Sequence, residues 1–401
     1  MRNVFYIIVL FFSTESIAQY NLVSNASFEN YSSCPSASNQ LTLSVSWINP
    51  TSAGSPDYFN SCSGLVGVPY CCSTICPCFQ YAKTGSAYAG LYPYSGTASN
   101  LREYIQTQFI TPMTNGKCYY IGFYTNVANW CGLACNKLGA YLSNSAVNLV
   151  GPTFLLNYTS QVKSFNNIII KDTLSWHLIS GVFQAVNNEQ FIAVGNFNND
   201  ATTDTLTFNS TALAPKYSYY FIDDVFVTPI DSILGGMPAF AGNNVTINAG
   251  DSTFIGQQIS NLNCNWYNGT VQIASNTSGL YVKPVTNTTY VVVQTLCGNT
   301  TTASVVVTVL PAGTGINELE QLKNITVSPN PSTGKIFLYR EKLFSDIEIK
   351  IYDVAGQLVF SDKFIGIKKE LELNLENGLY FVELINKETN QRTVKKVIIQ
   401  E

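Results

Sequence analysis

The stretch CCSTICPCF, residues 71–79, places four cysteines within nine residues. Cysteines this close together can bind a metal, act as a redox centre or form disulfides. Zinc sites usually combine C-x-x-C pairs with histidine, but the spacing here is C-C-x3-C-x-C and the single histidine, His177, lies far along the chain. The pattern therefore favours disulfides, provided that the chain enters an oxidising compartment.

The start of the chain supplies that condition. Arg2 is followed by the apolar run VFYIIVLFF and then by the small-residue pattern SIA. The run is shorter than the roughly 20 residues that span a bilayer, and this order of features is typical of a secretory signal peptide. We predict cleavage between Ala18 and Gln19, and a mature chain that is exported without membrane insertion.

Disulfides are therefore expected across the exported chain, and we predict that CCSTICPCF is a covalently closed loop. Adjacent cysteines rarely bond to each other because the resulting ring is strained, so Cys71 and Cys72 should reach different partners. The number of cysteines is odd, so at least one thiol stays free or bonds another molecule. The eleven cysteines are Cys34, Cys62, Cys71, Cys72, Cys76, Cys78, Cys118, Cys131, Cys135, Cys264 and Cys297.

The loop NWCGLACNK, residues 129–137, has residues suited to sugar binding. The apolar face of a pyranose can stack on the indole of Trp130, while Asn129 and Asn136 can hydrogen-bond hydroxyl groups. Tyr92 and Tyr94, in the turn-rich stretch GLYPYSG, are secondary candidates. The alternative is that Trp130 is a core residue that closes one end of the domain.

Catalytic motifs are not evident. His177 lies between Trp176 and Leu178 in an alternating apolar segment, which favours a structural role. The sequence contains no Gly-rich phosphate loop, HExxH or P-loop motif. We therefore expect a non-catalytic protein, with a secreted hydrolase as an alternative. A glycosidase would have to draw its two carboxylates from Glu29, Asp57, Glu103, Glu189, Asp223 and Asp224.

Charge divides the chain into two parts. Residues 19–311 carry 19 charged side chains in 293 residues, whereas residues 312–401 carry 25 in 90. The long front part is rich in Asn, Thr, Ser and Tyr. A surface with so little charge argues against binding of nucleic acid or of an anionic membrane.

Period-two alternation of β-branched and aromatic residues dominates each part, as in IEIKIYDV, and no segment shows convincing helical periodicity. Stretches rich in Gly and Pro separate the parts. We predict an all-β chain of three consecutive antiparallel β-sandwich domains. The boundaries are a signal peptide at 1–18, domains at 19–229, 239–310 and 325–401, and linkers at 230–238 and 311–324.

The last domain resembles a type IX secretion sorting domain of the type A class, found on exported proteins of the Bacteroidetes. Four motifs carry the resemblance in the right order: SPNPSTGKIFL, IYDVAGQLV, LENGLYFVEL and KKVII. The resemblance implies an Ig-like fold and the type IX secretion machinery as a partner. It also implies export through the periplasm and across the outer membrane, followed by release or attachment to the cell surface.

The middle domain resembles Ig-like or PKD-like modules through AGNNVTINAGDSTFIG, CNWY, PVTNTTYVVVQT and VVVTV. Such modules often precede a sorting domain and act as spacers. Within this resemblance we expect an internal disulfide between Cys264 and Cys297, and we expect Trp266 to be a core residue.

The front domain resembles the galactose-binding-like jelly rolls used as carbohydrate-binding modules. The likeness rests on NLVSNASFENYSSCP, SPDYFNSC, GSAYAGLYPY, REYIQTQF, SWHLISGVFQA and YYFIDDVFV. It implies a polysaccharide or other glycan as ligand. It also implies a structural calcium ion held by Glu29 with Asp223 or Asp224, although these carboxylates could instead only satisfy turn contacts.

These observations predict an exported binding or adhesion protein, with a structural component of a surface layer or matrix as a second reading. Deleting residues 325–401 should trap the protein in the periplasm with its signal peptide already removed, because the tail carries the export address. Cell fractionation with immunoblotting measures this. Truncated protein found outside the cell at normal levels would contradict the assignment.

Overall fold

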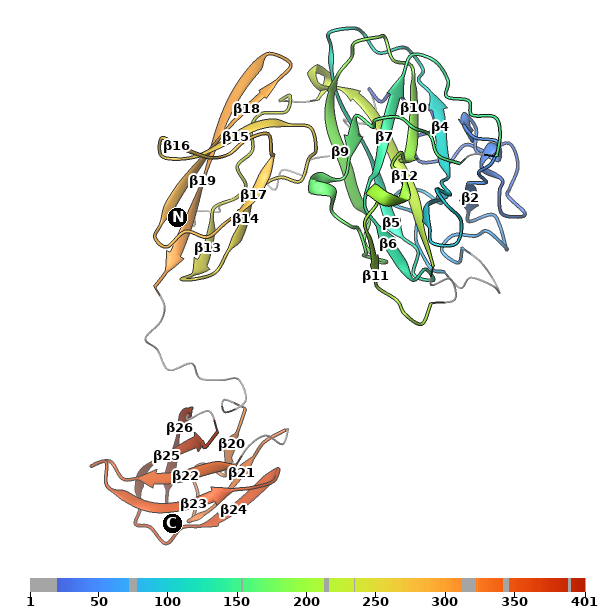
Figure 1. The fold of residues 1–401 in the computed structure, drawn as a ribbon. Helices are drawn as coiled ribbons and strands as arrows, with labels where there is room; N and C mark the ends of the chain where they lie inside the picture. The colour runs from blue at the N-terminus through green and yellow to red at the C-terminus, as the bar shows by residue number, and fades with distance from the viewer. Residues whose placement is uncertain are drawn as a thin grey trace, which may run out of the picture. The chain divides into compact units, whose positions relative to one another are not determined.

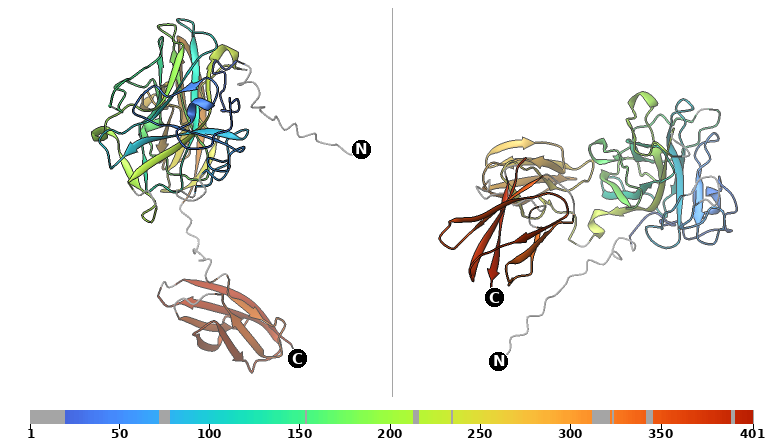
Figure 2. Two further views of the ribbon diagram at one scale, coloured as in Figure 1. Left: turned by 90° about the vertical axis from the view of Figure 1, so that its right-hand side faces the viewer. Right: turned by 90° about the horizontal axis from the view of Figure 1, so that it is seen from below.

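The structure is a computed structural model. It describes residues 20–311 except 72–77, 153, 213–215 and 234, and residues 322–400 except 323, 342–345, 389 and 390. The predicted signal cleavage site and Cys72 and Cys76 lie outside the described residues. Strands form almost all of the regular structure in every view (Figure 1, Figure 2). Helical turns in the front half are η1 (Leu41–Leu43), η2 (Phe165–Asn167), η3 (Asp200–Thr202) and η4 (Ile230–Ser232).

The chain divides into two compact units, residues 1–309 and 310–401. The first unit contains two sets of sheets, which we call the front module (residues 20–229) and the middle module (residues 239–309). The second we call the tail unit. Each is built of antiparallel ladders, so the predicted all-β sandwich fold is confirmed. None of the helices in the described ranges has the length and apolar character needed to cross a membrane.

The front module packs two five-stranded sheets around one core. One sheet has the order β1 (Trp47–Ile48), β4 (Tyr104–Gln108), β10 (Phe191–Asn196), β7 (Leu138–Ser143) and β8 (Val162–Lys163). The other has the order β2 (Asp57–Asn60), β3 (Ala87–Ser95), β12 (Tyr217–Pro229), β5 (Cys118–Val127) and β9 (His177–Gln184). A short ribbon pairs β6 (Leu133–Cys135) with β11 (Thr205–Thr207).

Side chains from both sheets fill the space between them. Ile105 and Val194 from the first sheet and Ile121, Phe123 and Ile222 from the second are all completely buried in one apolar cluster. Inward residues alternate along each strand because successive side chains point to opposite faces of a sheet. The apolar core therefore fixes the two sheets against each other.

The middle module is a smaller sandwich around Trp266, which is completely buried as predicted. Its larger sheet has the order β13 (Val245–Asn248), β19 (Asn299–Leu310), β18 (Thr288–Leu296), β15 (Asn263–Asn268) and β16 (Val271–Ala274). A two-stranded sheet of β14 (Thr253–Gly256) and β17 (Gly279–Val282) packs with it.

The front and middle modules are joined by direct contacts. The backbone N–H and the hydroxyl of Ser260 both donate to the carbonyl of Ser180, at 2.9 and 2.7 Å. The modules approach closely at Gly181, because a Cβ atom there would lie 3.0 Å from the carbonyl oxygen of Ser260, a tight contact. Val182 of β9 belongs to the apolar cluster of the middle module. The two modules therefore share buried surface as one unit.

The tail unit places a sheet of β20 (Thr326–Ser328), β21 (Lys335–Tyr339) and β24 (Lys368–Glu372) against a second sheet. The order of that sheet is β23 (Leu358–Phe364), β22 (Ile347–Tyr352), β25 (Gly378–Asn386) and β26 (Arg392–Ile399). Ile347, Ile349 and Ile351 are completely buried, as their alternation predicts.

Three disulfides join cysteines within the described residues. Cys71 bonds Cys78, so the cysteine-rich stretch is closed into a loop as predicted. Cys34 bonds Cys62 within the front module. Cys118 of β5 bonds Cys297, which links the front module to the middle module across a sequence separation of 179 residues.

The structure thus corrects the predicted pair Cys264–Cys297. Cys264 is a buried thiol on β15, directly opposite Gln294 of β18. Cys297 lies three residues beyond Gln294, which is about 10 Å along a strand at ~3.3 Å per residue. A disulfide needs Cα atoms within about 7 Å. The pair is therefore out of reach, whereas the Cα atoms of Cys118 and Cys297 are 6.1 Å apart.

We expect a non-reducing peptide map of the exported protein to contain a peptide that joins Cys118 to Cys297. Replacing both residues by serine should lower the free energy of unfolding by roughly 2 to 4 kcal/mol, because the bond constrains a long loop in the unfolded chain. Differential scanning calorimetry measures the loss. Wild-type protein measured under reducing conditions is the comparison, and the serine pair should lose no further stability when a reductant is added beyond what the remaining disulfides account for. A mapped Cys264–Cys297 peptide would refute the pairing.

Candidate functional site

A small cavity rimmed by aromatic side chains lies at one end of the front module. Its volume is about 80 Å³. We call it the aromatic cavity, and its lining residues are Ser38, Asp57, Phe59, Val66, Cys71, Cys78, Tyr92, Trp130 and Tyr219. The Cys71–Cys78 disulfide therefore forms part of its wall, which gives the cysteine-rich stretch a definite structural task.

Three rings form one side of the cavity. The Tyr92 and Tyr219 rings meet edge to face with centroids 4.7 Å apart, and Trp130 lies 5.9 Å from Tyr219 and 6.5 Å from Tyr92. Such edge-to-face contacts are favourable because the positive edge of one ring meets the negative face of the next. The rings therefore support one another in fixed orientations.

Asp57 supplies a buried carboxyl group at the cavity wall. The Tyr219 hydroxyl donates to one of its oxygens, and the backbone N–H of Asn39 donates to the other at 2.6 Å. Gly90 of β3 lies between β2 and β12, and a side chain there would collide with the Tyr219 hydroxyl. Burial raises the pKa of Asp57 above its usual range.

Glu103 is a second buried carboxyl group nearby. Its oxygens accept hydrogen bonds from the backbone N–H groups of Ser55 and Tyr92 and from the Ser55 hydroxyl. Burial and then the neighbouring Asp57 carboxylate raise the pKa of Glu103 to about 7. Among the described residues, neither Asp57 nor Glu103 forms an ion pair with a lysine or arginine.

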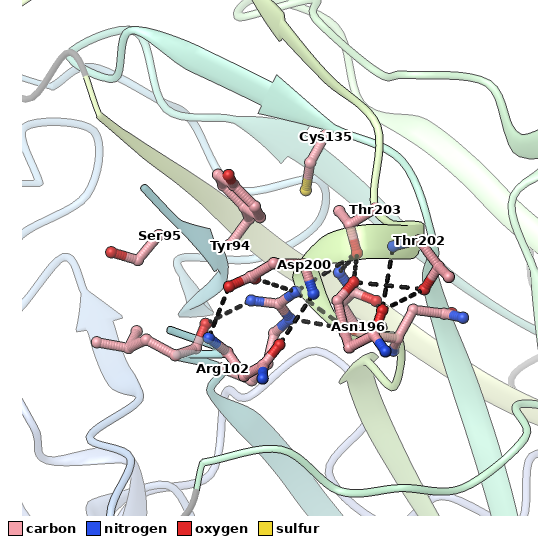
Figure 3. A network of polar contacts seen from close by, with 12 residues as sticks. Tyr94, Ser95, Arg102, Cys135, Asn196, Asp200, Thr202 and Thr203 are labelled. Carbon is pink, nitrogen blue, oxygen red and sulfur yellow. Dashed lines mark hydrogen bonds and ion pairs between the residues drawn. The ribbon is translucent and has the colours of Figure 1, made fainter. Parts of the chain in front are cut away.

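Arg102 precedes Glu103 and faces a different set of partners (Figure 3). Its guanidinium is completely buried and forms an ion pair with Asp200 of η3 at 2.8 Å. It also donates to the backbone carbonyls of Leu101 and Asn198 at distances from 2.8 to 3.2 Å. This network fixes the segment that enters β4, and so fixes the backbone of Glu103.

The predicted sugar-binding residues are divided by the structure. Trp130 and Tyr92 line the aromatic cavity. Trp130 is half-buried, so it is neither the fully exposed sugar-stacking residue nor the fully buried core residue that the sequence analysis considered. Tyr94 instead packs beneath Arg102, with its ring centroid 5.4 Å from the guanidinium carbon. Asn136 is buried and exchanges hydrogen bonds with Asp204. Asn129 is exposed on the loop but does not line the cavity.

A wider cleft, which the sequence analysis missed, contains a stacked pair of tyrosines. The Tyr141 and Tyr158 rings are 4.5 Å apart and inclined by 17°. The cleft has a volume of about 460 Å³. We call it the tyrosine cleft; its polar and aromatic lining consists of Tyr141, Ser143, Asn144, Ser145, Asn148, Tyr158, Gln161, Phe183, Asn187 and Glu189. Tyr158 lies outside the regular strands, so no alternation signal marked it.

The three carboxylates proposed for calcium meet at one loop. Both oxygens of Glu29 accept from the loop residues Ser86 and Ala87. Asp223 points inward and accepts from the backbone N–H of Lys83, whereas Asp224 is more exposed and accepts from the Thr84 hydroxyl. The described residues contain no group of three or more His, Cys, Asp or Glu placed to hold a metal ion.

These contacts are those of a loop anchor. Gly85 adopts φ 66°, and a Cβ atom there would collide with the Glu29 carboxylate, so the loop wraps closely around this group. The ladder between β12 and β5 shifts register between Asp223 and Phe226, which turns the two aspartates apart. A calcium ion stays a prediction from the resemblance, and no step of function is assigned to it.

The other candidate catalytic residues are not assembled into a reactive group. His177 is partly exposed and pairs with Asp172 at 3.2 Å. Hydrogen bonds, first from the Leu174 N–H, lower the pKa of Asp172 to about 2. The described residues place no hydroxyl or thiol nucleophile on the imidazole, which a triad requires. Glu189 accepts backbone N–H groups from its own turn.

Comparison with known families identifies the tail. Residues 326–400 match the family described as the secretion system C-terminal sorting domain. The chain therefore carries a type IX secretion sorting domain, which implies secretion or display at the cell surface. A search of curated proteins finds no match.

Solved structures show only remote likeness. PorZ, a surface component of the type IX secretion system of Porphyromonas gingivalis, has 16% identity and a TM-score of 0.19, over 28% of this chain and 15% of that one. The chain thus spans a small part of PorZ. The CBM22-1 xylan-binding domain from Paenibacillus barcinonensis has 10% identity and a TM-score of 0.27, over 51% and 91%.

The K2 cleaved adhesin domain of Lys-gingipain is similarly distant, with 11% identity and a TM-score of 0.26 over 51% of this chain and 96% of that one. At such distances, likeness carries no information about ligand or activity. The function has to be argued from the residues of this chain.

Protonation of Glu103 should make stability depend on pH. The folded-state pKa of about 7 lies above the unfolded value of ~4.3, so the folded protein binds the proton more tightly. The free energy of unfolding should therefore be highest below pH ~4.3 and fall as the pH rises to about 7. The total loss is on the order of 4 kcal/mol, at ~1.4 kcal/mol per pH unit.

Urea titrations between pH 5 and 8 test this prediction. Glu103→Gln resembles the protonated acid and should remove the part of the slope that Glu103 contributes. Burial also raises the pKa values of Asp57, Asp223 and Asp224, so these acids keep a slope of the same sign in the variant. Asp251→Asn, at an exposed turn of the middle module, is the control and should leave the slope unchanged. Wild-type stability that is constant or rises over this range would contradict the assignment.

Proposed function

We propose that the mature chain is a non-catalytic binding or adhesion protein of the cell surface or surroundings, and that its front module binds a glycan in the tyrosine cleft. The sorting domain supports the location. The stacked pair Tyr141–Tyr158 is the observation that carries the ligand class. The middle module serves as a spacer.

The tyrosine pair has the properties of a sugar platform. The Tyr158 side chain is 43% exposed, yet its ring is held in place by stacking on Tyr141. Tyr141 in turn contacts Phe197, with centroids 5.9 Å apart, so the platform is supported from below. A rigid, half-exposed ring offers apolar area with little loss of conformational entropy when a ligand binds.

The rest of the cleft is polar and suits hydroxyl groups. The amide side chains of Asn144, Asn148 and Asn187 lie along its lining. Gln161 is committed to the backbone of Leu142 at both its amide oxygen and its amide nitrogen, so it shapes the wall. Glu189 is the charged residue of the lining. Few charges and several amides favour a neutral polysaccharide over a polyanion.

The volumes of the aromatic cavity and the tyrosine cleft indicate which of the two can hold a sugar ring. An enclosed apolar cavity of roughly 150 Å³ is known to bind benzene. The aromatic cavity, at about 80 Å³, is too small for a pyranose, whereas the tyrosine cleft, at about 460 Å³, has room for one or more. Trp130 therefore contributes to a different kind of site.

We expect Tyr158→Ala to weaken retention on polysaccharide about thirtyfold, a loss of ~2 kcal/mol, with little change in melting temperature because the side chain is partly exposed. Affinity electrophoresis through gels that contain xylan, β-glucan or mannan measures retention. Tyr281→Ala, which removes a 73% exposed ring from the middle module, is the matched control.

Each remaining outcome distinguishes a function. Unchanged retention by folded Tyr158→Ala would remove the tyrosine cleft from the proposal. Failure of the wild-type protein to bind any polysaccharide would favour a structural component of a surface layer or matrix. Release of soluble sugars or peptides from a substrate panel would instead indicate a hydrolase.

A further inference from the structure

The aromatic cavity contains a buried carboxyl group, that of Asp57, with no basic side chain paired to it among the described residues. Asp57 is 9% exposed, lines the cavity and forms no ion pair within the described residues. Burial of a carboxylate without a cation is costly, and proteins normally pair such groups or bind a cation there. An unpaired acid in a cavity wall therefore indicates a missing positive partner.

The hydrogen-bonding capacity of Asp57 is nevertheless partly satisfied. One oxygen accepts from the Asn39 N–H and the other from the Tyr219 hydroxyl. The site therefore lacks a positive charge, and it already has hydrogen-bond donors to both carboxyl oxygens. A cation whose nitrogen carries methyl groups in place of N–H bonds meets that need.

The other walls also suit such a cation. Trp130, Tyr92 and Tyr219 form one aromatic side of the cavity, with ring centroids 4.7 to 6.5 Å apart, and Phe59 is a further aromatic residue of the lining. The faces of aromatic rings attract cations, most strongly where water is excluded, and rings grouped in this way recognise quaternary ammonium groups. The volume of about 80 Å³ admits one small group and no larger ring.

We propose that the aromatic cavity binds a methylated ammonium group, with Asp57 as counter-ion and Trp130, Tyr92 and Tyr219 as the aromatic cage. This site is separate from the tyrosine cleft and does not depend on glycan binding there. The disulfide Cys71–Cys78 holds one wall of the cage, and Gly90 leaves the space through which Tyr219 reaches Asp57.

Choline and its neutral isostere 3,3-dimethylbutan-1-ol provide the direct test, because they share shape and differ in charge. Isothermal titration calorimetry on the mature wild-type protein, at constant ionic strength, should show choline binding at least tenfold more tightly than the neutral alcohol. Equal affinity for both would mean an apolar pocket and would overturn the proposal. Absence of saturable choline binding up to about 100 mM would also overturn it.

Two variants assign the roles. Asp57→Asn keeps the shape of the side chain and should abolish the preference for choline over the alcohol. Trp130→Phe keeps an aromatic wall and should weaken choline binding several-fold, since indole is the stronger cation-binding ring. Asp251→Asn, an exposed carboxylate of the middle module, should change nothing. A folded Asp57→Asn protein that retains the full preference would refute the role of Asp57.

Glycan binding and cation binding can fail separately. Polysaccharide retention lost in Tyr158→Ala, with choline binding intact, supports two sites. Choline binding by a protein that retains no polysaccharide would leave the cation site standing and remove the glycan proposal. Retention of polysaccharide without choline binding would leave the glycan proposal standing and remove the cation site.

Discussion

The hydrogen bond from Tyr219 to Asp57 crosses β3 and ties together three neighbouring strands of the front module. It can form only because Gly90 has no side chain at the crossing point. Two buried carboxyls, Asp57 and Glu103, lie in the same region, and the Arg102 network on the far side of Glu103 fixes the entry to β4. Once these positions are set, the rings of Tyr92 and Trp130 have a defined place to pack. The region is costly to fold, because burial of acids opposes ionisation, and such a cost is tolerated where it prepares a site.

Under the two proposals, the front module would separate two kinds of recognition. The tyrosine cleft is wide, polar and open, so that it suits extended hydroxyl-rich chains. The aromatic cavity is small and has the carboxyl group of Asp57 in its wall, so that under our proposal it would suit a single cationic substituent. A ligand that carries both features would have to reach both places, whereas simple ligands would occupy one. The size and the charge of each cavity, rather than the fold of the module, therefore decide what it can bind.

The sequence predicted the class of fold because alternation is a local signal. The isoleucines of β22 and the buried Trp266 follow directly from it. That the CCSTICPCF stretch would be closed by disulfide bonding was also foreseen, because an exported chain favours disulfides and the spacing does not fit zinc. The particular bond from Cys71 to Cys78 was not foreseen. The bond between Cys118 and Cys297 was not, because it depends on how two modules dock and spacing carries no information about that. Tyr141 and Tyr158 were missed for the same reason, since their stacking joins a strand to an irregular segment. Asp57 was noted only as an acid, because its pairing with Tyr219 depends on Gly90.

The Cys118–Cys297 bond changes how the first unit would respond to mechanical load. Tension between the front end of the chain and residue 310 has a covalent route through the bond, so the segment between the two cysteines, spanning a separation of 179 residues, stays slack. Strands β6 to β18 lie inside that segment, together with Trp130, Tyr158 and Tyr219. If the protein is held from its C-terminal side and pulled by flow, the chain outside the segment between the two cysteines would therefore extend first. Residues of both candidate sites would be shielded from the strain by a single crosslink.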